Sequence, residues 1–515
     1  MSVKKKNLDA HLAEIFKQFV AIKDEDFKRS QEVFKSVFEE VKAKMGEKCN
    51  YFSKYSGQVL YAGSVYDGIK VSRLDEFDMD IVIRLPINYD NGENGIIIEN
   101  DQPGFVKMKI INAFDNLDKQ PEWEKCHKVT REWRDSEKYF LQNKFRQWMH
   151  GTVQKALNEM DGKVVVNGVT YLIKYKESGP AYTLNIRNDK GDPEFNLDVD
   201  LVPVIRFMLP RWPEGYRAVP GGQQAKEWLV VPKPNKGLKD ETMKNRCWRL
   251  SFQDYERELM KGCQQLKTTI RLIKKLRDAL ELKAIASYYI KTLFLWKIMN
   301  EDKKFWQNKI SVMFRIMVQE LRDAIKAKNI RYFWHQDNNL IEGLKPTLQK
   351  VYVDKLTEVL NSIEANDVDK IVASLLTVTE LTEFKKSEFY QKTAAAAAAK
   401  DVRDGASSVS RQSSVASNAS GNNSQSSQDS VPKSGNKSKV DNDLLKTLMD
   451  KIDVLVDKVT SLEDRMLRLE MRNGLKKNDT ITINKDILSL VADTTAMQMD
   501  DPKKDSTVDS LIEFN

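Results

Sequence analysis

The sequence predicts an α/β lobe, an α-helical lobe and a separate C-terminal coiled coil. Between residues 51 and 207, short apolar runs of strand length are separated by turn signals, which is typical of a sheet mixed with helices. From residue 263 to 390, apolar residues recur at helical spacing. The predicted segments are an N-terminal helix (1–48), an α/β core (49–225), a helical lobe (226–392), a disordered low-complexity linker (393–442), a coiled coil (443–473) and a tail of unknown structure (474–515).

Composition narrows the classes of protein that the chain can represent. Its 515 residues have a formal net charge of +8, which permits nucleic-acid binding without demonstrating it. The four cysteines lie far apart and form no C-x-x-C pair, which argues against a disulfide framework or a zinc ribbon. No apolar run approaches the length of a membrane span, and the first residues do not resemble a signal peptide. We therefore expect a reduced, cytoplasmic protein with no membrane partner.

The N-terminal stretch is predicted to form one long amphipathic helix from Leu8 to Glu47. Apolar residues keep a spacing of three and four along it, which is typical of a packing helix. Toward its C-terminal end the outer face has fewer acids, and its cations there are Lys42, Lys44 and Lys48, with Lys54 just beyond. Taken alone, these charges fit a solvated face as well as a binding face.

Acidic and apolar residues alternate in the segment E-F-D-M-D, which runs into the apolar Ile81-Val82-Ile83. This period is that of a strand with one polar face, so the carboxylates of Glu76, Asp78 and Asp80 point the same way. Three like charges on one face repel one another and are costly to bury without a counter-charge. Oxygen ligands of this kind suit Mg²⁺, with Mn²⁺ as a substitute. The alternative is an edge strand whose acids face solvent.

Two other stretches complete a candidate site around this strand. Gly63-Ser64 follows an apolar run, and a pair of small residues that opens a helix exposes backbone N–H groups to a phosphate. Asp198 and Asp200 lie in F-N-L-D-V-D-L-V-P, which has the same alternation and offers a third carboxylate from a neighbouring strand. A phosphate cradle and a carboxylate pair about a dozen residues apart are typical of a nucleotidyltransferase.

The stretch that joins the lobes and the helical lobe itself are predicted from turn signals and periodicity. Leu209 to Gly237 is rich in Pro, Gly and Trp, which predicts a long connection on the surface. The segment C-W-R-L-S-F is predicted to open a helix over Gln253 to Gly262. Further helices are predicted over Cys263–Leu282, Lys304–Lys328, Leu344–Asn361 and Asp367–Tyr390.

The C-terminal region is predicted to combine disorder with self-association. From Asp401 to Asn442 the chain is nearly free of large apolar residues and cannot bury enough surface to offset its ordering entropy. From Leu448 to Leu469 apolar residues alternate spacings of four and three, which is about three heptads. We expect residues 443–473 to self-associate as a coiled coil. The alternative is an amphipathic helix that folds back on the body of the protein.

The stretch GSVYDGIKVSRLDEFDMDIVIRLP resembles the core of cyclic GMP-AMP synthase and its animal relatives, the cyclic GMP-AMP synthase-like receptors. In that family a Gly-Ser pair is followed by E-F-D at this spacing, and a later V-D supplies the third metal ligand. Asp80 is not a family ligand, so we expect it to lie outside the ligands of the metal or in solvent. The resemblance implies phosphate contacts at Gly63 and Ser64 and catalytic metal ligands at Glu76, Asp78 and Asp200.

Two further motifs extend the resemblance into the helical lobe. They are W-R-L-S-F, which begins at Trp248, and S-Y-x-x-K-T, which begins at Ser287. An aromatic face suits a stacked base, and a cation suits phosphate. By position the resemblance implies that the nucleotides are bound by Arg249 and Ser251 at phosphates and base, Glu256 near a purine edge, Lys274 and Ser287 at the triphosphate, and Tyr288 stacked on a base.

The resemblance covers roughly residues 8 to 390 and implies a two-lobed nucleotidyltransferase. Such an enzyme joins ATP and GTP into a cyclic dinucleotide of the cyclic GMP-AMP type, an innate immune second messenger in antiviral defence. The interval after W-R-L-S-F is too short for the zinc ribbon of the vertebrate enzyme. This resembles insect-type receptors, which favour double-stranded RNA. The cations expected to hold that activator are Lys42, Lys44, Lys48, Lys54, Lys267 and Arg271.

Two other classes of protein remain open at this point. A template-independent RNA nucleotidyltransferase would share the three carboxylates, although the two motifs of the helical lobe do not favour it. A catalytically silent relative in the male-abnormal family would instead act as a scaffold through its coiled coil. The intact set of acidic residues does not favour that scaffold.

Overall fold

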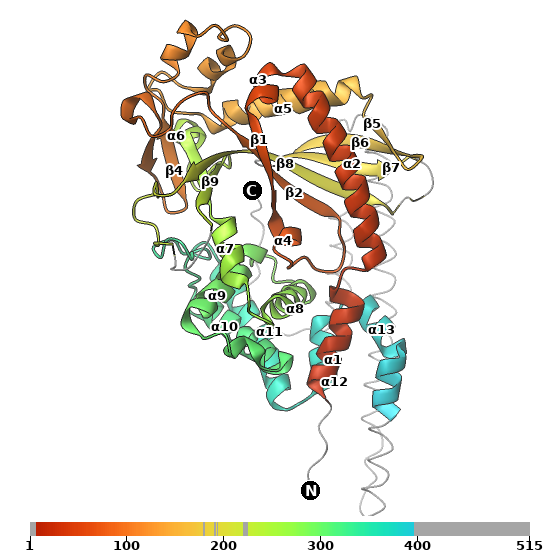
Figure 1. The fold of residues 1–515 in the computed structure, drawn as a ribbon. Coiled ribbons are helices and arrows are strands. Elements are labelled where there is room, and N and C mark those ends of the chain that lie inside the picture. The colour runs from red at the N-terminus through yellow and green to blue at the C-terminus, as the bar shows by residue number, and fades with distance from the viewer. Residues whose placement is uncertain (1–6, 179–180, 190–191, 193, 220–224, 396–515) are drawn as a thin grey trace, which may run out of the picture. The chain divides into compact units, whose positions relative to one another are not determined.

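A sheet of ten strands runs through the computed structural model, which describes residues 7–178, 181–189, 192, 194–219 and 225–395 (Figure 1). Eight strands follow the order β3-β4-β10-β9-β8-β7-β6-β5, and β2, with β1 on its far side, pairs with β8. The strands are β1 (Ser56–Ala62), β2 (Glu76–Ile83), β3 (Ile97–Asn100), β4 (Phe105–Lys109), β5 (Lys163–Val166), β6 (Val169–Ser178), β7 (Ala181–Asn188), β8 (Asn196–Met208), β9 (Glu227–Val231) and β10 (Cys247–Ser251).

The pairing of β2 with β8 positions the predicted carboxylates. The two strands are parallel, and Asp78 lies opposite Asp200 in their register, as Glu76 lies opposite Asp198. Phe77 and Met79 point to the other face of β2 and are fully buried, so the alternation seen in the sequence is confirmed. β8 is 13 residues long; its first part pairs with β2 and its last part with β9.

The N-terminal stretch is not the single helix that its periodicity predicts. It is divided into α1 (Leu8–Ile15), a π-helical segment (Phe16–Val20) and α2 (Asp24–Lys48). Ala21, at the break, has an extended backbone with φ −69° and ψ 141°. The acids at positions 24 to 26 open α2, where the helix dipole favours negative charge. Those acids were the sequence signal for the break.

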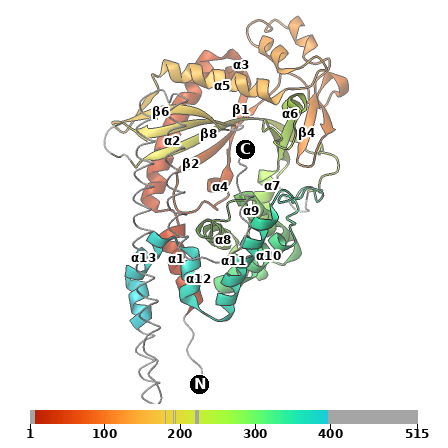
Figure 2. The same cartoon turned by 180° about the vertical axis from the view of Figure 1, so that it is seen from behind.

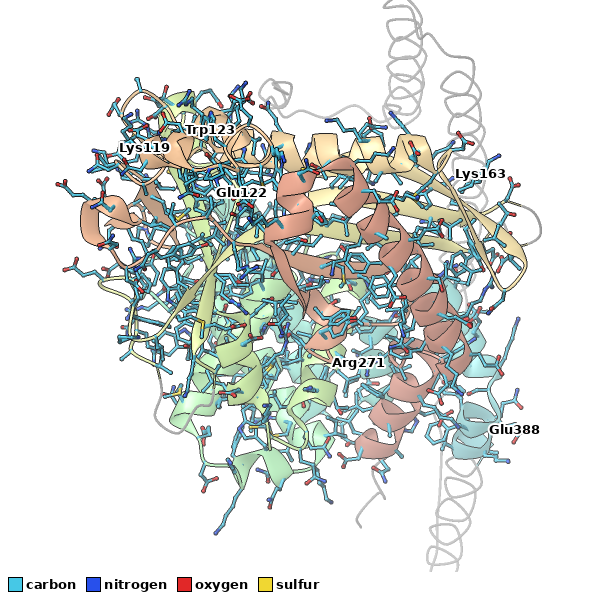
Figure 3. The ribbon with its side chains drawn as sticks, turned by 45° about the horizontal axis from the view of Figure 1, so that its top comes forward. Lys119, Glu122, Trp123, Lys163, Arg271 and Glu388 are labelled. Atoms are coloured by element: carbon cyan, nitrogen blue, oxygen red, sulfur yellow. The ribbon has the colours of Figure 1, made fainter. Side chains whose placement is uncertain are left out.

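Contacts from distant segments explain why the first helix ends where it does. The hydroxyl of Ser72 donates to the carbonyl of Phe19 at 2.7 Å, and its backbone N–H donates to the carbonyl of Val20 at 2.9 Å. Arg271 also donates to the carbonyl of Val20, at 2.7 Å (Figure 3). These carbonyls are therefore satisfied from outside, and the helix does not need to continue. The periodicity of the sequence contains no trace of such long-range bonds.

Helices α2 and α5 (Gln142–Glu159) pack against each other and cover one face of the sheet (Figure 1). The short α3 (Asn50–Tyr55) returns the chain from α2 into β1. Residues at helical spacing fill the interface, and all are fully buried: Val37, Val41 and Met45 of α2, and Phe145, Met149, Val153 and Ala156 of α5. This packing holds the sheet rigidly from behind.

One prediction about the segment between the lobes is wrong, and one strand near it was not predicted. The stretch from Leu209 to Gly237 contains β9, whose residues Trp228, Leu229 and Val230 are buried, so it is not wholly a surface connection. The W-R-L-S segment is the strand β10, and the helix predicted to follow it begins at Gln253 as expected. In both strands buried apolar side chains next to existing strands outweigh the Pro and Gly signals nearby.

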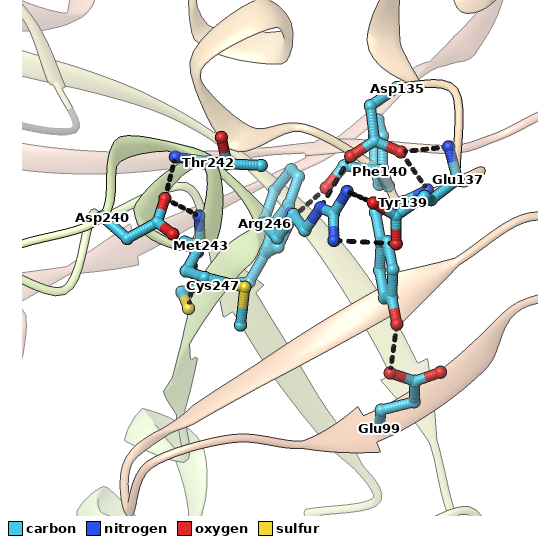
Figure 4. A network of polar contacts seen from close by, with 11 residues as sticks. Glu99, Asp135, Glu137, Tyr139, Phe140, Asp240, Thr242, Met243, Arg246 and Cys247 are labelled. Carbon is cyan, nitrogen blue, oxygen red and sulfur yellow. Dashed lines mark hydrogen bonds and ion pairs between the residues drawn. The ribbon is translucent and has the colours of Figure 1, made fainter. Parts of the chain in front are cut away.

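Strand β10 is anchored by a polar network around the residue that precedes it (Figure 4). Arg246, the last residue of α6 (Glu241–Arg246), donates to Asp135 at 2.6 Å and to Glu137 at 2.7 Å. Its guanidinium also lies over the ring of Tyr139, 4.3 Å from the centroid. The indole of Trp248 donates to the carbonyl of Phe140 at 2.8 Å. These bonds fix the strand on which Arg249 and Ser251 lie.

The predicted helical lobe is confirmed as a group of helices beside the sheet (Figure 2). The range from Asp367 to Tyr390 is not one helix, because Thr377 forms a capping box with Glu380 and starts a new one. The helices are α7 (Gln253–Met260), α8 (Leu266–Ala279), α9 (Ser287–Asn300), α10 (Ile310–Lys326), α11 (Pro346–Glu364), α12 (Val368–Leu375) and α13 (Val378–Lys386).

Several sequence predictions lie beyond the described part of the chain. The disordered linker from residue 396 onward, the coiled coil at 443–473 and the tail at 474–515 are outside the described residues. Within the described residues, no helix combines the length and apolar character needed to cross a bilayer.

We expect Arg271→Met to destabilise the protein. The substitution removes the bond to the carbonyl of Val20 and the contact with the ring of Phe16, 4.7 Å from the guanidinium. Because a hydrogen bond from a charged group contributes about 1.5–3 kcal/mol, thermal denaturation should show a melting temperature lower by a few degrees. Arg322→Met is the control, since among the described residues Arg322 forms an ion pair with its neighbour Asp323 alone. Equal melting of the two variants would contradict this account of the helix break.

Candidate functional site

The three predicted metal ligands come together at one end of the parallel strand pair. One carboxylate oxygen from each of Glu76, Asp78 and Asp200 lies within 4.8 Å of the other two, and all three residues are half-buried. The hydroxyl of Thr183 donates to Asp200 at 2.5 Å and orients that carboxylate. On the other side, Lys70 bonds Glu76 at 3.3 Å. The prediction of a shared face on neighbouring strands is confirmed.

The electrostatics of this group favour a cation. Burial, together with the neighbouring charges of Glu76 and Asp200, raises the pKa of Asp78 to about 7. Burial likewise raises the pKa of Asp200, although the bond from Thr183 opposes the shift. The donor set consists of carboxylate oxygens, which suits a divalent ion such as Mg²⁺. The residues therefore fit the metal site that the sequence predicts.

Gly63 is required by the position of Asp78. Its φ is +70°, in the region that favours glycine, and a Cβ on it would lie 1.6 Å from Oδ2 of Asp78. The turn and the carboxylate can occupy their places only because the side chain is absent. Ser64 follows in the short α4 (Gly63–Tyr66).

A pocket of about 350 Å³ lies next to the carboxylates and gathers the residues that the sequence motifs predict. These residues come from α4, β10, α7, α8 and α9, which are far apart in the chain. Every residue predicted to bind nucleotide lines this pocket: Gly63, Ser64, Arg249, Ser251, Glu256, Lys274, Ser287 and Tyr288.

Cations and hydroxyls on one side of the pocket are held in place by the chain itself. Lys274 donates to the carbonyl of Ile69 at 2.8 Å, and burial together with the nearby cations Arg277 and Lys70 lowers its pKa to about 8. The hydroxyl of Ser287 accepts a bond from Arg277 at 2.7 Å. A bound phosphate would offer Lys274 a stronger counter-charge than the carbonyl does.

The opposite side of the pocket is aromatic, and Glu256 has a different environment from the one expected. The guanidinium of Arg249 lies 5.9 Å from the centroid of the Tyr288 ring. Glu256 accepts bonds from the Tyr288 hydroxyl at 2.7 Å and from the Trp334 indole at 2.9 Å, and its second oxygen pairs with Lys291 at 2.8 Å. Other side chains of the protein thus bind the carboxylate of Glu256, which the resemblance places at a purine edge.

Asp80 is buried and lies outside the group of three ligands, so of the two expected positions the structure has the first and not the solvent-exposed one. Its side chain is 7% exposed, lines the pocket and accepts a bond from Gln253 at 3.1 Å. Burial and the charge of Asp78 raise its pKa to about 7. Sequence reasoning also missed several other residues of the pocket, among them Asp67, Lys233, Lys291 and Tyr332, although Asp67 and Lys291 lie within quoted motifs.

The cations predicted to hold nucleic acid have varied surroundings. Lys44 pairs with Glu47, Lys48 with Glu159 and Lys54 with Glu122, all on exposed surface. Lys267 lies close to the turn, because a Cβ on Gly68 would be 2.9 Å from its Nζ. Arg271 is turned toward the N-terminal helices, as described above. Lys42 is half-buried on α2.

A groove that the sequence did not predict lies beside Lys48. Its volume is about 550 Å³, and it runs between α5 and the segment around residues 124–132. Its walls include the acids Glu124 and Glu132 and the ring of Trp148. Four further lysines contribute to it: Lys125, Lys128, Lys144 and Lys155.

Comparison with protein families agrees with the geometry of both lobes. Residues 65–262 match the Mab-21 protein nucleotidyltransferase domain. Residues 265–358 match the Mab-21 protein HhH/H2TH-like domain. The first range includes the three carboxylates and β10, and the second includes α8 and α9.

Several insect proteins are similar to this chain over most of their own length. A cyclic GMP-AMP synthase-like receptor of Ctenocephalides felis is 34% identical over 406 residues, which is 75% of this chain and 91% of the relative. That of Aethina tumida is 34% identical over 70% of this chain and 89% of the relative. That of Tribolium castaneum is 33% identical over 73% and 94%. The chain therefore belongs to the Mab-21 nucleotidyltransferase family, among the cyclic GMP-AMP synthase-like receptors of insect type.

Proposed function

We propose that the protein is an RNA-activated nucleotidyltransferase that makes a cyclic dinucleotide from ATP and GTP. The product, of the cyclic GMP-AMP type, would act in the cytoplasm as a second messenger of innate antiviral immunity. The observation that supports this most directly is the triad of Glu76, Asp78 and Asp200 at the edge of a pocket lined by the eight predicted nucleotide contacts. The names of the insect relatives point to the same class of product.

Each part of the pocket has a task in this reaction. A ribose hydroxyl of one nucleotide attacks the α-phosphorus of the other, forms a phosphodiester and releases pyrophosphate; a second such attack within the linear product closes the ring. Mg²⁺, or Mn²⁺ in its place, would be held by the triad and would activate the hydroxyl and neutralise phosphate charge. Ser64, Lys274 and Ser287 bind the triphosphate, which fixes the geometry of attack. Tyr288 and Arg249 hold a base by stacking.

The proposed activator is double-stranded RNA. Lys42, Lys44, Lys48 and Lys54 lie at or just beyond the C-terminal end of α2, and the lysine-lined groove beside Lys48 extends the same cationic character. The ion pairs of these lysines are exposed and weak, so phosphates can compete for them. A-form RNA is bound through phosphates and 2′-hydroxyls by shape, without reading of sequence. Arg271 has a structural partner and is the least suited of the predicted contacts.

The proposal is tested by incubating the purified chain with labelled ATP, GTP and Mg²⁺, with and without long RNA or DNA duplexes. We expect a cyclic dinucleotide in the presence of RNA, and we expect Asp200→Asn to reduce its formation by at least about a hundredfold, because the triad loses one negative charge where charge develops. Chromatography with a nuclease-resistant standard identifies the product. A linear RNA extension product would instead identify a template-independent RNA nucleotidyltransferase. Full activity of Asp200→Asn would refute the metal assignment.

Repulsion within the triad predicts a pH-dependent stability of the metal-free protein. Asp78 has a folded pKa of about 7 against an ordinary value of 3.8, so its protonated form favours the fold and this contribution is lost as the pH rises through 7. Asp78→Asn should therefore raise the melting temperature at about pH 8, and the gain should shrink steadily as the pH falls below 7 and vanish only near pH 3.8, the ordinary pKa of the carboxyl. Saturating Mg²⁺ should stabilise the wild type and leave the variant unchanged. A gain that is independent of pH would contradict the assigned cause.

The RNA surface is tested with a matched pair of triple variants. Lys44, Lys48 and Lys54 changed to Ala should weaken RNA binding and lower the slope of log affinity against log salt by about one per lost phosphate contact. RNA stimulation of synthesis should fall accordingly. The control changes Lys326, Lys345 and Lys350, which are exposed on the helical lobe, and alters net charge equally. If both triples behave alike, or if DNA duplexes activate as well as RNA of equal length, the assignment of surface or ligand is wrong.

A further inference from the structure

Part of the wall of the pocket is a buried group of charges that no step of the proposed reaction uses. Asp67 is 6% exposed, Glu256 4% and Lys291 5%. The ammonium of Lys291 lies 2.6 Å from an oxygen of Asp67 and 2.8 Å from an oxygen of Glu256. Lys291 is the lysine of the S-Y-x-x-K-T motif, for which the resemblance gives no role. Burying three charges is costly unless their geometry is satisfied on every side.

Each carboxylate in this group belongs to a different part of the pocket. Asp67 caps α4, so it ends the turn that begins with Gly63 and Ser64. Its second oxygen accepts from Arg257 at 2.9 Å, and Arg257 also donates to the carbonyl of Tyr61 at 2.7 Å, just before the turn. Helix α7 therefore holds the turn next to the triad at both ends through Arg257, and helix α9 holds it at Asp67 through Lys291.

Glu256 belongs to the aromatic side of the pocket. It accepts hydrogen bonds from the hydroxyl of Tyr288, whose ring is proposed to stack on a base, and from the indole of Trp334. Among the described residues, no hydrogen bond or ion pair joins Glu256 directly to Asp67; each contacts Lys291. The Tyr288 ring and the Gly63–Ser64 turn are thus linked to each other through one ammonium group.

We propose that Lys291 is a positioning residue that couples base binding to the phosphate-binding turn. A bound base holds the ring of Tyr288 in place, and the Tyr288 hydroxyl in turn fixes Glu256. Through Lys291 the base also fixes Asp67 and the turn that faces the triad. Because reacting atoms must be held within a fraction of an ångström, a turn released from this link would misplace the triphosphate. The inference rests on the proposed function, since it assigns the base and the triphosphate to these two sides.

A double-mutant cycle tests the coupling. Asp67→Asn and Glu256→Gln are made singly and together, in the wild-type background and in Lys291→Met, and kcat/KM for RNA-stimulated synthesis is measured at a temperature where circular dichroism shows every variant folded. In the wild-type background the double variant should deviate from the product of the single effects by about fivefold or more. In the Lys291→Met background the effects should multiply. Multiplicative effects in both backgrounds, or equal coupling in both, would overturn the proposal.

A matched control separates positioning from a general loss of an ion pair. Lys297 lies on the same helix and pairs with Glu301 at 3.1 Å and Glu320 at 3.0 Å, away from the pocket. We expect Lys291→Met to lower kcat by at least about tenfold and Lys297→Met to change it by less than about twofold. Equal losses of kcat would mean that Lys291 is only structural.

A second readout keeps the proposal separate from the question of product. The same cycle is measured as the Kd of ATP with Mg²⁺ by calorimetry, without RNA or GTP, because ATP alone contacts both the base side and the turn. If no cyclic dinucleotide is formed, the proposed function fails while the coupling in ATP affinity still decides the role of Lys291. Coupling in Kd that disappears in Lys291→Met supports the proposal, and its absence in the wild-type background refutes it.

Discussion

Repulsion between three carboxylates is the constraint that the described structure must satisfy. The parallel register of β2 and β8 places Asp78 opposite Asp200, and Glu76 joins them from the same face, with oxygens within 4.8 Å of one another. Such a cluster is stable only on a rigid frame with a cation at hand. The frame is supplied by α2 and α5 behind the sheet and by β1 and β7 on either side. Burial and the charges of Glu76 and Asp200 raise the pKa of Asp78, and a divalent ion would relieve this cost.

The helical lobe supplies the site with cations, and most of them are committed within the protein. Lys274 bonds the turn at Ile69, Arg257 bonds it at Asp67, and Arg271 bonds the break in the N-terminal helices. The net charge of +8 is therefore a poor measure of the charge offered to RNA. The exposed lysines of α2 and of the groove beside it are better candidates, because their partners are weakly held surface acids.

Sequence patterns predicted what depends on local spacing. Alternation placed Glu76 and Asp78 on one face and offered Asp198 and Asp200 on the neighbouring strand, and the family resemblance singled out Asp200. The helix break at Ala21 was missed, because Ser72 and Arg271 cause it from distant positions. Strand β9 was missed because its Pro- and Gly-rich flanks resemble a loop, while the partners that make it a strand are far away in the chain.

In the candidate site, too, local patterns were predicted and contacts between distant segments were not. Motifs predicted which residues line the pocket, but they could not predict what those residues contact. Glu256 was expected to meet a base, whereas the structure occupies it with Tyr288, Trp334 and Lys291. Asp80 was expected outside the ligands or in solvent, and the structure buries it outside the ligands with a hydrogen bond from Gln253. Hydrogen-bond partners across elements are set by tertiary packing, which single-sequence reasoning does not contain.

The contact between Gly63 and Asp78 has a consequence for how this kind of enzyme can fall silent. A single methyl group at residue 63 would overlap an oxygen of Asp78, because the Cβ position is 1.6 Å from it. The rest of the pocket, and the lysine-bearing surfaces outside it, do not depend on that atom. A chain could thus lose chemistry while it kept its acidic residues, its fold and its ligands. An intact acidic triad is therefore a weaker sign of activity than a glycine at this one position.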